Sequence, residues 1–220
     1  MQPGDAEREI MARIRSASAR LSPEAIAAER DALRRPAAAS LRGADLLEVF
    51  SDNLRRNGAS VVVAADRDAA VEAISDFLAA RHRQRRVVAG HDPRLAALPW
   101  RVGSLLPRFA AAGPGDAVGV SYARSGIAET GSLVLWLDRN NPASNNLLCE
   151  DHVVLLDRRD LHPRLEDVWP ARDWQDPARW PRGLMMISGP SSTADIAMQL
   201  VLGAHGPRAL HVIVVGDAPT

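Results

Sequence analysis

The middle of the chain alternates short apolar runs with a segment of helical periodicity. Residues 59–64 and 86–89 are β-branched runs, and residues 67–81 between them carry apolar side chains three or four positions apart. The first pattern favours strands and the second favours a helix. We therefore predict one βαβ unit here.

Further apolar runs predict more strands in the second half of the chain, with a polar loop at residues 140–146. These strands lie at residues 118–122, 131–137, 153–157, 184–187 and 210–215, and a bend or hairpin is expected to join the first two. Continuous apolar strands that alternate with helices are typical of a mostly parallel sheet covered on both faces. The predicted fold class is therefore α/β, in which ligands gather beyond the carboxyl ends of the strands.

The first 57 residues have a different pattern, rich in Ala, Arg and Glu with apolar positions at helical intervals. Helices are predicted here, with breaks near Pro23 and Pro36 and a helix start at Ser22-Pro23. We predict an N-terminal helical extension over residues 1–57 and an α/β domain over residues 58–220.

Composition narrows the class of partner. The chain has 220 residues, 46% of them hydrophobic, and its 27 basic and 27 acidic side chains cancel. A neutral chain has no overall field that attracts nucleic acid, and no apolar stretch approaches the roughly 20 residues that span a bilayer. The N-terminus also lacks a secretion-signal pattern. We expect a cytoplasmic protein with no nucleic-acid partner and no membrane span.

Cys149 is the only cysteine. One thiol cannot build a disulfide framework, a cysteine-ligated iron–sulfur cluster or a zinc knuckle within this polypeptide. His152, next to Glu150 and Asp151, matches no standard metal spacing. We therefore expect no metal or cofactor in this chain, and any redox metal would come from another protein.

The most distinctive local pattern is the polar segment 188–195, which follows the apolar run 184–187. It predicts a strand, a turn and a helix that starts at Ser192, with Asp195 as the acid of a capping box. Unpaired N–H groups at such a helix start can hold an anion, so Ser188, Gly189, Ser191, Ser192 and Thr193 are candidate ligand-binding residues. The alternative is ordinary helix capping. Neither nucleotide-binding glycine motif is present, so NAD and ATP are not predicted.

His91 and Glu129 are two further candidates. His91 follows the 86–89 strand and can serve as an acid–base group at the carboxyl edge; alternatively, Asp92 simply caps a helix that starts at Pro93. Glu129 stands between apolar residues and a Thr130-Gly131 bend. Burial would raise the pKa of its carboxyl group and suit it to proton transfer or nucleophilic attack, whereas the alternative is a turn residue facing water.

His205 is predicted to end the helix that starts at Ser192, because glycine and proline follow it. A helix of about ten residues is about 15 Å long, so His205 is expected at the far end from Ser191.

Three segments carry a resemblance to a known family. They are GIAETGSLVL at residues 126–135, SGPSSTADI at residues 188–196 and LVLGAHGP at residues 200–207. Together they resemble the LUD domain of bacterial lactate-utilisation proteins, and most closely its small stand-alone members. The resemblance covers the chain from about Val61 to its end.

The resemblance implies an accessory role in the oxidation of L-lactate to pyruvate, with partner proteins that carry the iron–sulfur clusters. It also implies a three-layer α/β/α fold similar to the phosphosugar-isomerase and CoA-transferase group. The positions that match the family are Glu129, Thr130 and Gly131, then Ser188, Gly189, Pro190, Ser191, Thr193 and Asp195, and then His205, Gly206 and Pro207. Many relatives have arginine where this chain has Ser192, which weakens a carboxylate clamp there.

Two other functions stay open at this point. One is an independent enzyme or binding protein for a CoA or sugar-phosphate type of anionic ligand, with Glu129 as nucleophile or base. The other is a non-catalytic scaffold that binds iron–sulfur partners.

Overall fold

The structure is a computed structural model, and it describes residues 3–17, 22–32, 41, 45–82, 84–169, 176, 180–194 and 200–216. The chain divides into two compact units, Met1–Ala39 and Ser40–Thr220. The first unit contains helices α1 (Pro3–Ala17) and α2 (Pro23–Ala32), which the sequence predicted. The Ser22 hydroxyl accepts a hydrogen bond from the Ala25 N–H, so Ser22 caps α2 as expected.

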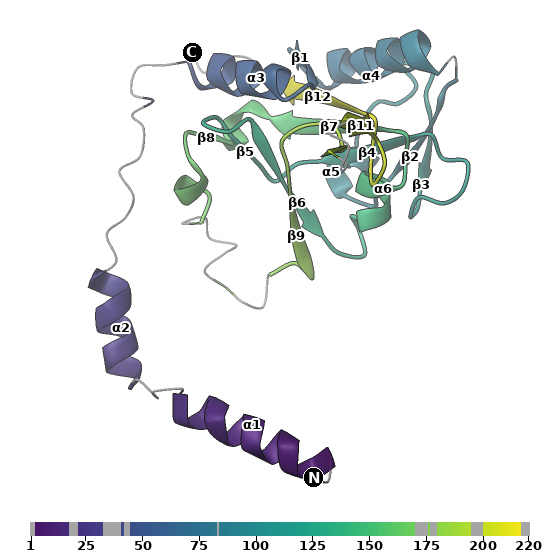
Figure 1. The fold of residues 1–220 in the computed structure, drawn as a ribbon. Helices are drawn as coiled ribbons and strands as arrows, with labels where there is room; N and C mark the ends of the chain where they lie inside the picture. The colour runs from purple at the N-terminus through teal and green to yellow at the C-terminus, as the bar shows by residue number, and fades with distance from the viewer. Residues whose placement is uncertain are drawn as a thin grey trace. The chain divides into compact units, whose positions relative to one another are not determined.

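The second unit is built on a six-stranded sheet whose neighbouring strands are all parallel (Figure 1). Its order is β1 (Ser60–Ala64), β12 (Ala209–Val215), β7 (Asp151–Asp157), β4 (Val118–Tyr122), β2 (Arg86–Ala89) and β3 (Leu106–Phe109). The predicted parallel α/β class is confirmed, as are the strands and helix of the βαβ unit. β1 and β2 are not neighbours, because β12, β7 and β4 lie between them.

Alternate side chains of the central strands pack into two separate cores. On one face, Val153 and Leu155 of β7 pack with α4 (Arg67–Arg81) and α5 (Pro93–Ala96). On the other face, Val154 and Leu156 pack with α3 (Leu46–Arg56) and with a second sheet. The period of two along each strand therefore buries both faces of the sheet.

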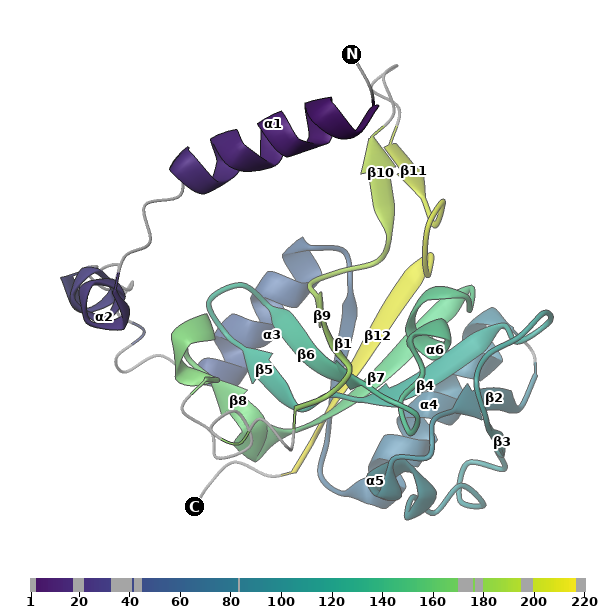
Figure 2. The ribbon, with the colours of Figure 1, turned by 90° about the horizontal axis from the view of Figure 1, so that it is seen from below.

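The second sheet has the order β8 (Leu161–His162), β5 (Ser125–Ile127), β6 (Ser132–Leu137) and β9 (Gly183–Ile187) (Figure 2). The predicted hairpin between the strands at residues 118–122 and 131–137 is wrong: β5, which lies in the expected bend, forms the hairpin with β6, while β4 stays in the parallel sheet. β9 pairs antiparallel with β6. The sequence did not separate these strands from the parallel sheet, because a buried apolar run looks the same in either.

The predicted helix at Ser192 is wrong. Residues Ser192–Ala194 form strand β10, which pairs antiparallel with β11 (Leu200–Leu202). A Ser-Thr pair at the start and a Leu-Val-Leu run at the end suit a strand pair as well as a helix, and backbone pairing decides between them. Asp195, the predicted capping acid, lies outside the described residues.

Several shorter elements complete this unit. They are α6 (Ala143–Leu147) and the 3₁₀ turns Arg158–Asp160 and Leu165–Asp167. The sequence placed a boundary after residue 57, and in the structure α3, just before it, packs on β1 and β8 within the larger unit. No helix within the described ranges is long and apolar enough to cross a membrane.

Candidate functional site

A cavity of about 300 Å³ lies at the amino-terminal ends of β7 and β12, and we call it the amino-edge cavity. Three segments distant in sequence form it: the end of β9 with residues 188–191, the loop 205–207, and α6 with the start of β7. Its lining residues are Asn146, Leu147, His152, Met185, Met186, Ile187, Ser188, Gly189, Pro190, Ser191, His205, Gly206, Pro207 and Leu210.

Backbone hydrogen bonds hold the 188–191 turn against the loop before β12. The Ser191 N–H donates to the Pro207 carbonyl and the Gly203 N–H donates to the Ser191 carbonyl, each at 2.8 Å. His205 therefore lines the same cavity as Ser191. The predicted separation of these two residues is wrong, because the chain between them returns as a strand pair instead of extending as a helix.

A chain of hydroxyl groups links two of the predicted segments. Thr130 Oγ1 lies 2.7 Å from Ser132 Oγ, and Ser132 Oγ lies 2.6 Å from Ser188 Oγ. This chain connects the Thr130-Gly131 bend to the edge of the amino-edge cavity. Each hydroxyl can donate its proton to the oxygen of the next one, so the three groups fix one another's orientation.

The C-terminal end of α3 supports both bends. The Asn57 side chain donates to the Thr130 carbonyl at 3.2 Å. Gly131 has a positive φ of 63°, and a side chain there would overlap the backbone at Leu54. A Cβ at Gly189 would likewise overlap the Asn57 carbonyl. These glycines are needed because the helix approaches the bends closely.

A buried polar row lies behind the cavity. His152 Nε2 is 3.0 Å from Ser121 Oγ, and Ser121 Oγ donates to Asn146 Oδ1 at 2.6 Å. Asn146 is 1% exposed, and its Nδ2 has no hydrogen-bond partner among the described residues. Burial lowers the pKa of His152 to about 3, so the imidazole is neutral at physiological pH.

Sequence reasoning missed Asn146 and gave no role to His152. Asn146 belongs to a stretch predicted to be a loop, whereas the structure has helix α6 there with Asn145 and Asn146 fully buried. The dense asparagines of residues 140–146 were the available signal. Buried amides need partners, so such a cluster indicates a structured segment.

Glu129 lies apart from the cavity lining. Its carboxylate is half-buried and accepts a hydrogen bond from the Leu165 N–H at 3.0 Å, while the Asn53 side chain donates to its backbone carbonyl at 3.1 Å. The carboxylate therefore binds the 3₁₀ turn that follows β8. Its predicted role as base or nucleophile stays a prediction.

Three other candidates have a simple placement. His91 is exposed and its ring lies 6.3 Å from the Phe109 ring, while the Asp92 carboxylate accepts from the Arg94 N–H and caps α5. Ser192 is an exposed residue of β10, and Thr193 follows it in the same strand.

In the part of the chain that the structure describes, no three His, Cys, Asp or Glu residues are grouped as metal ligands would be.

Comparison with known proteins agrees with this architecture. Residues 116–215 match the family model of the LUD domain. A crystal structure of a DUF162 family protein from Deinococcus radiodurans has a TM-score of 0.57 at 20% identity, covering 81% of this chain and all of that chain, so it shares the fold.

Two curated relatives show the sequence similarity. Lactate utilization protein C of Macrococcus caseolyticus is 32% identical over 102 residues, which are 46% of this chain and 44% of that protein. The protein of the same name from an Exiguobacterium species is 26% identical over 202 residues, 86% of this chain and 87% of that protein. The first alignment thus spans less than half of its relative's length. Residues 116–215 of this chain are therefore similar to the LUD domain, and the similarity to the named relatives agrees with that match.

Proposed function

We propose that this chain acts in lactate utilisation, as an accessory component of an iron–sulfur-dependent system that oxidises L-lactate to pyruvate. The observation that carries the proposal is the meeting of the 188–191 turn and the 205–207 loop at one cavity, because both segments lie within the residues that match the LUD-domain model. The names of the similar proteins support the same role.

The division of labour follows from the chemistry. Oxidation of lactate to pyruvate removes two electrons and two protons, and an acceptor must take the electrons. Cys149, the only cysteine of this sequence, is buried, and burial raises the pKa of its thiol to about 11. A cysteine-ligated cluster would therefore lie outside this sequence, in the iron–sulfur partners. This chain would contribute a binding surface for a small organic acid or for a partner.

The amino-edge cavity suits a small ligand with acceptor oxygens. It offers the hydroxyls of Ser188 and Ser191 and the imidazole of His205. Its volume of about 300 Å³ is at the lower end of the range for small-molecule sites. The described lining residues include no Lys or Arg, so hydrogen bonds would carry more of the recognition than ion pairs.

The decisive experiment is deletion of the gene from its own host, followed by growth on L-lactate as sole carbon source. We expect growth on lactate to be lost and growth on pyruvate to be retained. Complementation with the full chain should restore growth, and complementation with the double variant Ser188→Ala and Ser191→Ala should restore it poorly. Ser192→Ala, which changes the neighbouring exposed hydroxyl, is the matched control. Normal growth of the deletion strain on lactate would refute the proposal.

A second experiment tests the partners. Affinity purification of the chain from lactate-grown cells should recover proteins that contain iron and acid-labile sulfide. If the purified preparation contained no iron while deletion of the gene abolished growth on lactate, the role in lactate utilisation would stand. The iron–sulfur part of the proposal would then be refuted.

The buried Nδ2 of Asn146 favours a second candidate, a protein that binds or converts a small anionic ligand by itself. An unpaired buried donor is costly, and a ligand carbonyl or carboxylate can pair with it if the cavity wall shifts. A fragment of a sugar phosphate or of CoA matches the cavity volume better than a whole CoA molecule. Turnover by the purified chain would support an enzyme; binding without turnover would support a carrier.

A further inference from the structure

A second cavity of about 150 Å³ lies at the opposite edge of the parallel sheet, and we call it the carboxyl-edge cavity. It opens where β2 and β4 end, which is the edge where parallel α/β sheets usually bind ligands. The 188–191 turn and His205 do not line it. Its lining residues are Asp92, Pro93, Arg94, Tyr122, Arg124, Trp136, Asp138, Asn140 and Asn141.

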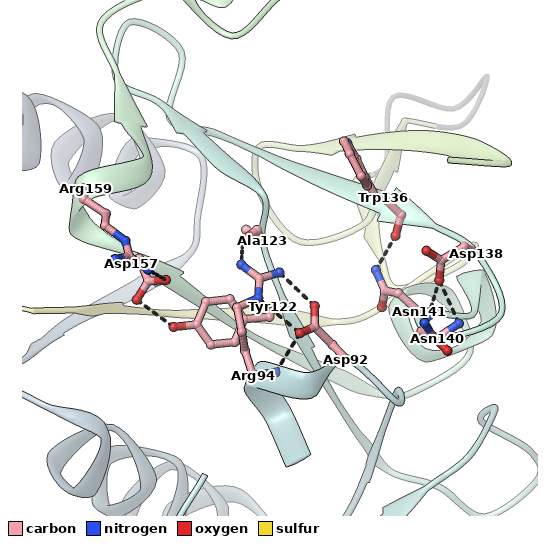
Figure 3. A network of polar contacts seen from close by, with 10 residues as sticks. All are labelled: Asp92, Arg94, Tyr122, Ala123, Trp136, Asp138, Asn140, Asn141, Asp157 and Arg159. Carbon is pink, nitrogen blue, oxygen red and sulfur yellow. Dashed lines mark hydrogen bonds and ion pairs between the residues drawn. The ribbon is translucent and has the colours of Figure 1, made fainter. Parts of the chain in front are cut away.

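Arg94 is held rigidly in this cavity (Figure 3). Its Nε and Nη2 donate to the Asp92 carboxylate at 3.1 and 2.8 Å, and its Nη1 donates to the Ala123 carbonyl at 3.2 Å. The guanidinium also lies 4.1 Å above the Tyr122 ring. A guanidinium has five N–H donors, and three make these bonds within the described structure, so two are left for a ligand.

Tyr122 and Arg124 form the rest of the wall. The Tyr122 hydroxyl donates to the Asp157 carboxylate at 2.9 Å, and burial together with that carboxylate raises the pKa of Tyr122. Its ring is therefore a fixed, neutral surface under Arg94. The Arg124 guanidinium lies 4.7 Å above the Trp136 ring, so a second cationic group borders the cavity.

Asn141 provides an acceptor without a partner. Its Nδ2 donates to the Trp136 carbonyl at 2.5 Å, which fixes the orientation of the amide, and its Oδ1 is buried with no hydrogen-bond partner among the described residues. Asn141 is 8% exposed. Buried side-chain acceptors are rarely left unpaired, so an orphan acceptor in a cavity wall indicates a missing donor.

The loop that carries Asn141 is fixed in place. Asp138 Oδ1 accepts hydrogen bonds from the N–H groups of Asn140 and Asn141, at 2.7 and 2.9 Å. The loop also packs so tightly on Gly90, at the end of β2, that a Cβ there would overlap the Asn140 carbonyl. The orphan acceptor therefore cannot find a partner by a small movement of its own loop.

We propose that the carboxyl-edge cavity binds a small hydroxylated carboxylate. The ligand carboxylate accepts hydrogen bonds from the two remaining Arg94 donors, and a ligand hydroxyl donates to Asn141 Oδ1 once the atoms that cover this buried oxygen move aside. A water occupies about 30 Å³ of liquid, so a cavity of about 150 Å³ suits a molecule of a few heavy atoms. Because L-lactate belongs to this ligand class, the proposal deepens the role proposed above, but it places the ligand at different residues, and the binding test below is separate from the growth test.

Calorimetric titration of the full chain with three matched probes tests this proposal. Glycerate has both the carboxylate and hydroxyls, propionate lacks the hydroxyls, and glycerol lacks the charge. We expect glycerate to bind at least tenfold more tightly than either, since propionate loses the hydrogen bond to Asn141 and glycerol loses the charge-assisted hydrogen bonds from Arg94. Equal affinities for the three probes would overturn the proposal.

Variants then locate the site. Arg94→Gln should weaken glycerate binding at least tenfold, and Arg124→Gln, which changes an exposed side chain, should weaken it about threefold. Ser191→Ala in the amino-edge cavity is the matched control and should leave the affinity unchanged. If Arg94→Gln does not fold, Arg124→Gln decides the matter. Unchanged affinity for glycerate in Arg94→Gln, or in Arg124→Gln if Arg94→Gln does not fold, would refute the assignment.

Discussion

The cavities at the two edges of the parallel sheet are lined by different polar groups. At the amino edge, His152, Ser121 and Asn146 form a neutral row, and the described lining of that cavity holds no Lys or Arg. At the carboxyl edge, Arg94 and Asp92 form an ion pair that lines the cavity itself. One sheet thus presents a neutral hydrogen-bonding site and a charged site.

This difference teaches that the strand-edge rule locates only one of the two cavities. The rule applies to loops that follow parallel strands, and it finds the carboxyl-edge cavity. The amino-edge cavity exists because β9 of the second sheet and the segment 203–207 come together beside the starts of β7 and β12. The signature turn 188–191 belongs to this second arrangement.

The largest predicted effect is a pH dependence that comes from the amino edge. Burial lowers the pKa of His152 to about 3 and that of His211 to about 4, from 6.5. Between the ordinary pKa of 6.5 and the lowered pKa of each histidine, the unfolded chain binds more protons than the folded chain. The free energy of unfolding therefore falls as the pH falls through this window. Lowering the pH from 6.5 to about 5 should cost about 1.5 kcal/mol for each histidine, about 3 kcal/mol in total.

Urea unfolding at several pH values measures this dependence. His152→Gln should remove about half of it, because one of the two buried imidazoles is gone. The exposed His91 is the matched control, and His91→Gln should leave the dependence unchanged. If the free energy of unfolding depended on pH equally in His152→Gln and in the parent protein, the buried His152 at the amino edge would not be a source of the pH dependence.

The next largest effect on the free energy of unfolding is expected from a substitution at Gly119. A Cβ on Gly119 would overlap the Asn145 carbonyl and lie 3.1 Å from Cys149 Sγ, so α6 must move away from β4. We expect Gly119→Ala to lower the free energy of unfolding by about 2 kcal/mol and to disturb the Ser121–Asn146 hydrogen bond. Gly113→Ala, where a Cβ meets open space, should change stability by less than about 0.5 kcal/mol. Equal stability of the two variants would contradict the packing argument.

The smallest effect tests the carboxyl edge. Tyr122→Phe removes the hydrogen bond to Asp157 and keeps the ring under Arg94. It should lower the free energy of unfolding by about 1 kcal/mol and leave the slope between pH 6.5 and about 5 unchanged. A changed slope in this variant would mean that the titrating groups of the two edges are coupled.

Local pattern was sufficient where an element is fixed by its own residues. The βαβ elements and the caps at Ser22 and Asp92 follow from spacing and capping chemistry, and the structure has them. The apolar runs also predicted the α/β class correctly, because strands buried on both faces need no polar alternation.

Prediction failed where the same short sequence fits either of two sheets, or fits both a helix and a strand. The run at residues 184–187 is equally apolar in a parallel or an antiparallel sheet, and residues 192–194 suit a helix start or a strand. Pairing of β9 with β6, which is distant in the sequence, settled the first, and pairing of β10 with the nearby β11 settled the second. The error in the second segment also separated Ser191 from His205.

The sequence by itself therefore determined the fold class, most of the elements and the segments that carry the family signature. Only the tertiary structure decided which sheet each strand joins, that Ser191 and His205 share one cavity, and that Asn146 and Asn141 are buried, each with one atom that has no hydrogen-bond partner among the described residues. The physical reason is that periodicity and capping act within a few residues, whereas strand pairing and the partners of a buried polar atom depend on contacts between distant parts of the chain.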